Sequence, residues 1–110
     1  MLMASFIFTE KDLTEAFFAL DTKIEKAAQA TDGFLGKESW VSPDGAKRNS
    51  VYYWADATAL RSFSSHPLHL EAKLQYEKWY GGFHVVISEV TKSYGDNAFE
   101  HVTPNGRKAR

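Results

Sequence analysis

The residues best suited to chemistry in this sequence are the two histidines of the run His66-Pro67-Leu68-His69. Proline fits the first position of a helix, because its missing N–H would have no intrahelical partner there. This predicts His66 at the N-cap, where the positive end of the helix dipole opposes protonation of the imidazole. His69 would lie one turn into the helix. A neutral imidazole beside an apolar cavity can act as a general base toward an acidic O–H or C–H group.

A structural role for the same histidines stays open, in which His66 caps the helix and His69 fills a surface groove. Metal binding is the weaker alternative. A spacing of three residues can present two imidazoles, but the chain has no Cys, and Glu71 and Asp56 show no ligand spacing to them. We therefore predict no metal site.

Sixteen aromatic side chains are many for a chain of 110 residues. A domain of this size has little interior, so some rings are expected at an interface or around a ligand cavity. Such rings can line an apolar pocket in which a few polar tips orient a ligand. Our candidate ligand-binding residues are Tyr53, Trp54, Phe63, Tyr76, Trp79 and Phe83, within a wider set that also holds Tyr52 and Tyr80. Tyr76, Trp79 and Tyr80 are spaced as on one face of a helix, and such a stripe fits packing in the core or at a dimer interface equally well.

The elements that must position these residues follow from periodicity and turn chemistry. Apolar runs and alternation predict strands, apolar residues at three-and-four spacing predict helices, and a Pro-Asp-Gly turn predicts a hairpin. The expected elements are strand 3–8, helix 12–30, hairpin strands 34–42 and 48–54, short helix 56–63, helix 67–80 ended by Gly81-Gly82, and strand 83–94. This order, β-α-β-β-α-β, predicts an α+β, ferredoxin-like domain with an antiparallel sheet.

Large apolar groups fall on both faces of the predicted strands, as in Trp40 beside Val41 and Tyr53 beside Trp54. The helices can cover one face, and nothing else in the chain can cover the other. This predicts a homodimer in which two sheets pack face to face. Residues 1–94 form the expected domain, and residues 95–110 read as a polar tail, mobile or held by a neighbouring chain, with Phe99 and Val102 as possible anchors.

Composition excludes several function classes. A formal charge of -1 gives no electrostatic footprint for nucleic acid or an anionic membrane. The absence of Cys removes disulfides and thiolate chemistry. The first ten residues lack the flank and length of a signal peptide or membrane span, so we expect a cytoplasmic protein.

The run from Tyr53 to Ala72 resembles the antibiotic biosynthesis monooxygenase (ABM) domain family. The likeness lies in a W-x-D-x-x-A-L element at a strand end, then a short helix, then Pro and His opening another helix. Residues 33–36 and 90–95 also resemble that family, so the resemblance covers about residues 3–95. The resemblance implies a dimeric α/β barrel with a cavity between sheet and helices. It matches His69 to the family's helix-opening His and Trp54 to its strand-end Trp.

Some ABM relatives oxygenate polycyclic phenols or quinone precursors without metal or flavin, by deprotonating the substrate, and others degrade haem. The haem-degrading members carry Asn, Trp and His where this chain has Ser5 or Phe6, Phe63 and Lys73, which disfavours haem chemistry. Our first hypothesis is a cofactor-independent monooxygenase of a small aromatic substrate. His69 is then the base or orienting group, with His66, Tyr53 and Tyr76 as hydrogen-bonding candidates. The alternative is a non-catalytic ligand-binding or structural homodimer of the same fold.

Overall fold

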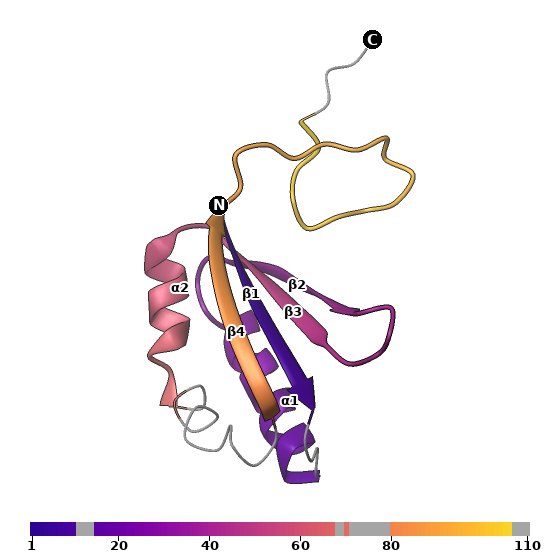
Figure 1. The fold of residues 1–110 in the computed structure, drawn as a ribbon. Coiled ribbons are helices and arrows are strands. Elements are labelled where there is room, and N and C mark those ends of the chain that lie inside the picture. Colours follow the sequence, from indigo (N-terminus) through magenta and orange to yellow (C-terminus); the bar gives the residue numbers. More distant parts are fainter. Residues whose placement is uncertain (11–14, 68–69, 71–79, 107–110) are drawn as a thin grey trace.

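The computed structural model describes residues 1–10, 15–67, 70 and 80–106. Figure 1 shows strands and helices in the predicted β-α-β-β-α-β order. The elements are β1 (Leu2–Glu10), α1 (Glu15–Gln29), β2 (Phe34–Val41), β3 (Arg48–Trp54), α2 (Ala57–Ser64) and β4 (Tyr80–Glu89). The ferredoxin-like α+β fold expected from the sequence is thereby confirmed.

The four strands form one antiparallel sheet in the order β2-β3-β1-β4. Both helices pack on the same face, because Ala28 of α1 and Phe63 of α2 share one buried cluster with Trp54 of β3. We call this the helix face. Side chains alternate along a strand, so Tyr53, next to Trp54, lies on the opposite face, which we call the open face.

Helix α2 follows β3 directly, and its start is set by a side-chain cap. The carboxylate of Asp56 accepts the N–H of Ala59 at 2.9 Å, which satisfies a donor that the first helical turn leaves unpaired. Ala59 and Phe63 of this helix are buried. Gly33 lies beneath this helix with a φ of +89°, and a Cβ there would come within 2.6 Å of the Ala59 Cβ. A glycine is required at that contact.

Strand β4 corrects one predicted boundary. The sequence placed this strand at residues 83–94, after a helix that reached Tyr80 and ended at Gly81-Gly82, whereas Tyr80 and both glycines belong to β4, which ends at Glu89. The reason is the length of β1, whose Thr9 pairs with Gly82 while Leu2 pairs with Glu89. The ladder ends at Glu89 because β1 begins at Leu2, and the next N–H, that of Val90, donates to the Met1 carbonyl at 3.0 Å.

Two predicted helices lie partly outside the described residues. The start of the first, predicted at residue 12, falls on residues 11–14, which lie outside the described residues, and α1 is described from Glu15 to Gln29. Of the helix predicted over 67–80, Pro67 and Leu70 are described as helical. The Leu70 N–H donates to the His66 carbonyl at 3.1 Å, which agrees with a helix that starts at Pro67.

The chain beyond β4 forms a closed loop at one end of the sheet (Figure 1). The Gly106 N–H donates to the Ser93 carbonyl at 2.7 Å, and Asn105 bonds both backbone groups of Gly95. Val102 packs on Gly36 of β2, where a Cβ would come within 2.7 Å of its methyl group. Phe99, the other expected anchor, is 78% exposed. In the described part of the chain, no helix has the length and apolar character to cross a membrane.

Candidate functional site

Trp54 is the centre of the helix face. It ends β3, has no exposed surface, and is surrounded by the rings of Phe63 at 5.0 Å and Phe34 at 5.2 Å between centroids. Its indole Nε1–H has no hydrogen-bond partner among the described residues. A buried donor left unpaired costs about 1–3 kcal/mol, so native proteins rarely keep one without a reason.

Tyr52 extends this aromatic layer, because residues two positions apart on a strand point to the same face of the sheet. Its ring stacks on those of Phe63, at 5.8 Å, and Trp54, at 6.4 Å. The ammonium of Lys37 lies 5.3 Å from the centre of the Tyr52 ring. Burial, reinforced by the charge of Asp21, raises the pKa of Tyr52 well above its ordinary value. The phenol therefore stays protonated and can donate a hydrogen bond at any physiological pH.

Asp21 of α1 is an acidic residue whose charge helps to raise the pKa of both Tyr52 and Tyr80. It receives no hydrogen bond within the described part of the chain, and burial raises its pKa, against an opposing effect of Lys37. Tyr80 of β4 faces the same helix, with its ring 5.9 Å from that of Phe17. Burial, with a contribution from Asp21, raises the pKa of Tyr80 to about 12.

The helix face continues over β4 as an exposed apolar surface. Phe83, Val85 and Ile87 point to this side and are each about half exposed, at 48%, 47% and 55%. Phe83 meets Phe6 of β1 at 5.7 Å between ring centroids, and Phe6 in turn meets Tyr80 at 5.5 Å. Aromatic side chains therefore run from α2 across β3 and β1 to β4.

The structure brings some predicted site residues together and separates another. Trp54 and Phe63 are in contact, and Phe83 lies on the same face near the β4 edge. Tyr53 points to the open face and cannot line the same cavity within one protomer. His66, half-buried, follows α2. The predictions for His69, Tyr76 and Trp79 fall outside the described residues.

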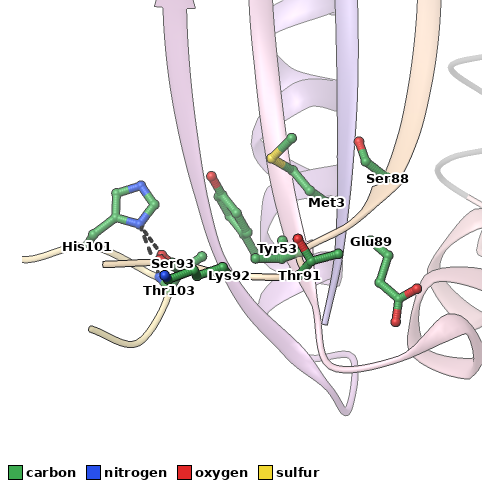
Figure 2. A pocket seen from close by; sticks show the side chains of 10 residues that line it. Met3, Tyr53, Ser88, Glu89, Thr91, Lys92, Ser93, His101 and Thr103 are labelled. Atoms are coloured by element: carbon green, nitrogen blue, oxygen red, sulfur yellow. Dashed lines mark hydrogen bonds between the residues drawn. The ribbon is translucent and has the colours of Figure 1, made fainter. Parts of the chain in front are cut away.

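Tyr53 instead borders a pocket of about 360 Å³ between the open face and the C-terminal loop (Figure 2). Its hydroxyl donates to the Glu38 carboxylate at 2.5 Å, and the Glu38 carboxylate also accepts from His101 Nε2 at 3.1 Å. Burial and the bond to Glu38 raise the pKa of Tyr53 to about 12. Two segments distant in sequence are thus joined by one carboxylate.

The bonds of His101 assign its tautomer. The Thr103 N–H donates to His101 Nδ1 at 3.1 Å, so Nδ1 is an acceptor and Nε2 carries the proton given to Glu38. The Thr103 hydroxyl lies 2.8 Å from the same Nδ1 and also bonds the Ser93 hydroxyl. Each side chain of this hydrogen-bonded network, from Tyr53 to Ser93, therefore has a partner. By contrast, the side-chain oxygen of Asn49, also on the open face, is buried and has no partner in the part of the chain that the structure describes.

Sequence reasoning missed Asp21, Glu38 and His101. Asp21 had a detectable signal, because it borders the apolar stripe that α1 turns to the sheet, one position after Leu20 and three before Ile24. His101 and Glu38 are 63 positions apart, and no local pattern connects them. Across the described residues, no three His, Asp or Glu side chains gather to hold a metal ion.

The fold recurs in solved structures. Rv0793 from Mycobacterium tuberculosis is similar with a TM-score of 0.73 and 18% identity, covering 86% of this chain and 98% of that one. SnoaB from Streptomyces nogalater, a cofactor-independent oxygenase, has a TM-score of 0.69 and 13% identity, covering 84% and 94%. An antibiotic biosynthesis monooxygenase has a TM-score of 0.68 and 13% identity, covering 84% and 100%. At these identities the likeness shows the fold alone.

Among curated proteins none matches the sequence significantly. The sequence does match the family described as Monooxygenase af470-like, over residues 4–89, which is most of the chain and spans the six described elements apart from the first two residues of β1. This agrees with the resemblance to ABM domains carried by the run from Tyr53 to Ala72. The chain belongs to the Monooxygenase af470-like family.

Proposed function

We propose that this protein is a cofactor-independent monooxygenase that binds a small phenolic or quinone-precursor substrate on the helix face. The observation that carries the proposal is the Trp54 indole N–H, which is fully buried among aromatic rings and has no described partner. A planar aromatic ligand with a carbonyl or phenolate oxygen would supply the missing acceptor. The rings of Tyr52 and Phe63 would supply apolar walls of the same shape.

The substrate class follows from the reaction that such a site can promote without a cofactor. Removal of a proton from an activated CH₂ group gives a carbanion, which transfers electrons to O₂ and forms a peroxide at that carbon. Loss of water then leaves a carbonyl, so CH₂ and O₂ become C=O and H₂O. Donors such as the Trp54 N–H and the Tyr52 O–H stabilise the negative charge on the substrate oxygen as it develops. SnoaB, of the same fold, is a precedent for oxygenation without a cofactor.

The base that starts this reaction is a separate question from the substrate. The sequence predicts His69, with His66 as its neighbour, and a His69→Ala variant that keeps full turnover would remove that role. His66 lies at the end of α2, whose other end Asp56 caps next to Trp54. The oxygenase proposal rests on Trp54 and holds for either base.

We propose further that the protein is a cytoplasmic homodimer formed through the open faces. Trp40 and Val86 of this face are 62% and 42% exposed, and Asn49 has a buried side-chain oxygen that lacks a donor. A second copy would cover the two apolar side chains and could supply that donor. Sedimentation at micromolar concentration tests this, and a strictly monomeric mass would refute it.

A non-catalytic ligand-binding protein is the second candidate, because the unpaired Trp54 donor favours an aromatic ligand whether or not that ligand reacts. Oxygen consumption separates the two. Anthrone is a suitable probe, since its CH₂ group is acidic and its oxidation product is anthraquinone. An oxygenase consumes one O₂ for each anthrone converted, whereas a binding protein shows saturable binding without consumption.

Trp54→Phe tests the observation itself. The variant keeps an aromatic ring and loses the N–H, so we expect anthrone affinity to fall about tenfold, as for the loss of one hydrogen bond to a polarised oxygen. Trp40→Phe on the open face is the matched control and should leave affinity unchanged. Equal affinity of wild type and Trp54→Phe would contradict the proposal.

A further inference from the structure

We propose that Asn105-Gly106 is a site of spontaneous deamidation, and that this modification irreversibly opens the C-terminal loop, residues 90–106. The inference does not depend on the proposed oxygenase or on the dimer. Three observations carry it: the order of these two residues, the bonds that the Asn105 amide makes, and the bonds that an acid in its place could not make.

Asparagine followed by glycine is the residue pair in which deamidation meets the least steric hindrance. The backbone nitrogen of the second residue must approach the side-chain carbonyl carbon of the first, and glycine has no Cβ to obstruct that approach. Of the three asparagines in the chain, Asn105 is the one that precedes a glycine, whereas Asn49 precedes a serine and Asn97 an alanine. Asn105 and Gly106 are both exposed, so water can reach the reacting atoms.

The reaction needs no cofactor and no oxidant. The Gly106 nitrogen loses its proton and attacks Cγ of Asn105, which forms a new C–N bond and closes a five-membered succinimide ring. The bond from Cγ to Nδ2 breaks, and the nitrogen leaves with that proton as ammonia. Water then opens the ring at either carbonyl, which gives aspartate or isoaspartate. Because ammonia is released into solution, the amide does not re-form.

The closed loop holds both reacting groups in other bonds. Asn105 Oδ1 accepts the Gly95 N–H at 3.1 Å, and Asn105 Nδ2 donates to the Gly95 carbonyl at 3.0 Å and to Asn97 Oδ1 at 2.8 Å. The Gly106 N–H donates to the Ser93 carbonyl at 2.7 Å. For the ring to form, the Asn105 side chain must leave Gly95 and the Gly106 nitrogen must leave Ser93. The rate of deamidation is therefore set by how often the loop opens.

The product no longer fits the closed loop. An amide nitrogen carries two N–H donors, and here they point at the Gly95 carbonyl and at Asn97 Oδ1, whereas an ionised carboxylate only accepts. Aspartate at position 105 keeps the bond from the Gly95 N–H and places oxygen against oxygen at both other contacts. Isoaspartate also lengthens the backbone by one CH₂ group, directly before the nitrogen that bonds Ser93.

The charge of the product opposes closure as well. Asp96 and Glu100 border a hollow of about 710 Å³ within the loop, and Asn105 borders the same hollow. A third carboxylate there adds repulsion between like charges. Deamidation therefore removes two donors and adds a negative charge at the residue that joins the two ends of the loop.

Opening of the loop would also change its contacts with β2. Val102 packs on Gly36, and His101 donates to the Glu38 carboxylate at 3.1 Å. Both contacts come from the segment between Gly95 and Asn105, so we expect both to loosen once these ends separate. The pocket beside Tyr53, of which His101 forms one wall, would then open to solvent (Figure 2).

Ageing of the full chain at mildly alkaline pH tests the site. Mass spectrometry of the peptide that contains Asn105 measures how fast the amide becomes an acid. We expect modification at Asn105 and not at Asn97 over the same time, with the urea-unfolded chain modified about tenfold faster or more. Glu38→Gln, which loosens the loop, should be modified about fivefold faster than the wild type. Glu89→Gln is the matched control and should age as the wild type does.

Asn105→Asp tests the consequence, because it supplies one of the two products directly. We expect hydrogen exchange of the Gly106 amide to rise about tenfold or more, since its bond to Ser93 is lost. Asn97→Asp is the matched control, because it adds the same charge to the same loop and keeps an oxygen that accepts from Asn105. Its Gly106 amide should exchange as slowly as that of the wild type.

Each part of the proposal can be overturned by itself. Equal rates of deamidation in the wild type, in Glu38→Gln and in the unfolded chain would show that the closed loop does not control the reaction. Modification at Asn97 in place of Asn105 would refute the site. A Gly106 amide that stays protected in Asn105→Asp, or exchanges equally fast in Asn97→Asp, would overturn the opening of the loop. None of these results depends on O₂ consumption, so the oxygenase is tested separately.

Discussion

The two faces of the sheet use neighbouring residues of β3 in opposite ways. Tyr53 and Trp54 are both buried, with 4% and no exposed surface, and each carries one hydrogen-bond donor. On the open face the Tyr53 hydroxyl begins a continuous chain of bonds through Glu38 and His101. On the helix face the Trp54 N–H bonds nothing that is described.

This difference separates a structural polar cluster from a candidate binding site. A cluster whose donors and acceptors satisfy one another has little left to offer a ligand, and here it fastens the C-terminal loop to β2. The Trp54 N–H on the other face, which has no partner among the described residues, keeps its bonding capacity. The unpaired Asn49 oxygen is the exception on the open face, and it is the group that a second copy of the chain could satisfy.

The largest effect should come from removing Trp54 on the helix face, with removal of Trp40 on the open face as the comparison. Trp54→Ala empties a fully buried site between β3 and α2, and we expect it to lower the free energy of unfolding by about 3–5 kcal/mol. Trp40→Ala on the open face, where the ring is 62% exposed, should cost under about 0.5 kcal/mol in dilute monomer. Urea denaturation followed by circular dichroism measures both.

The two variants Trp40→Ala and Trp54→Ala also test the dimer proposal. If two open faces pack together, Trp40→Ala should weaken association and leave the unfolding of the monomer nearly unchanged. Sedimentation of the variant across a concentration series measures this. A loss of monomer stability as large as that of Trp54→Ala would show that the two faces do not differ as described.

A smaller loss of stability is expected from substitution of Glu38, whose carboxylate joins the C-terminal loop to the sheet. Glu38→Gln keeps the shape and removes the charge from the bonds to Tyr53 and His101. We expect about 1 kcal/mol less stability, because charge-assisted bonds become neutral ones. The amide of Gly106, which donates to Ser93, should exchange faster as the loop is released.

Glu89→Gln provides the control for that measurement, since Glu89 borders the same pocket and is exposed. Its substitution should leave the exchange of the Gly106 amide unchanged. Equal acceleration in both variants would mean that general charge, rather than the bonds of Glu38, holds the loop in place.

Most of the helix face could be predicted from the sequence, because local patterns determine it. The apolar stripe of α1, the Asp56 cap and the alternation of β3 each follow from residues close together in the chain. The division of Tyr53 and Trp54 between two faces also follows from alternation. Grouping them in one candidate site overlooked that consequence.

What could not be predicted depends on distant partners. The Gly81-Gly82 pair favours a helix end, and only the length of β1 draws both residues into β4. The bond between His101 and Glu38 joins residues 63 positions apart across a loop without regular structure. Asp21 lies in a predictable helix, yet its exposure to two phenols depends on strands β3 and β4.

The smallest effect, and the most specific to each face, is expected in the titration of two phenols. Tyr53 on the open face and Tyr80 on the helix face both have a pKa raised from 10.0 to about 12. A raised folded-state pKa contributes stability that is complete below pH 10 and is lost as the pH rises through about 12. The free energy of unfolding should therefore fall as the pH rises from 10 to about 12.

The neighbours of the two phenols differ, and this allows each face to be tested by itself. Glu38→Gln should lower the pKa of Tyr53 and leave Tyr80 unchanged, because Glu38 acts on Tyr53 through a hydrogen bond and its charge. Asp21→Asn should lower the pKa of Tyr80 and leave Tyr53 unchanged. Ultraviolet absorbance of the phenolate, assigned with Tyr53→Phe and Tyr80→Phe, measures both. If either substitution moved both phenols equally, the faces would be electrostatically coupled, and an Asp21 acting only on the helix face would be excluded.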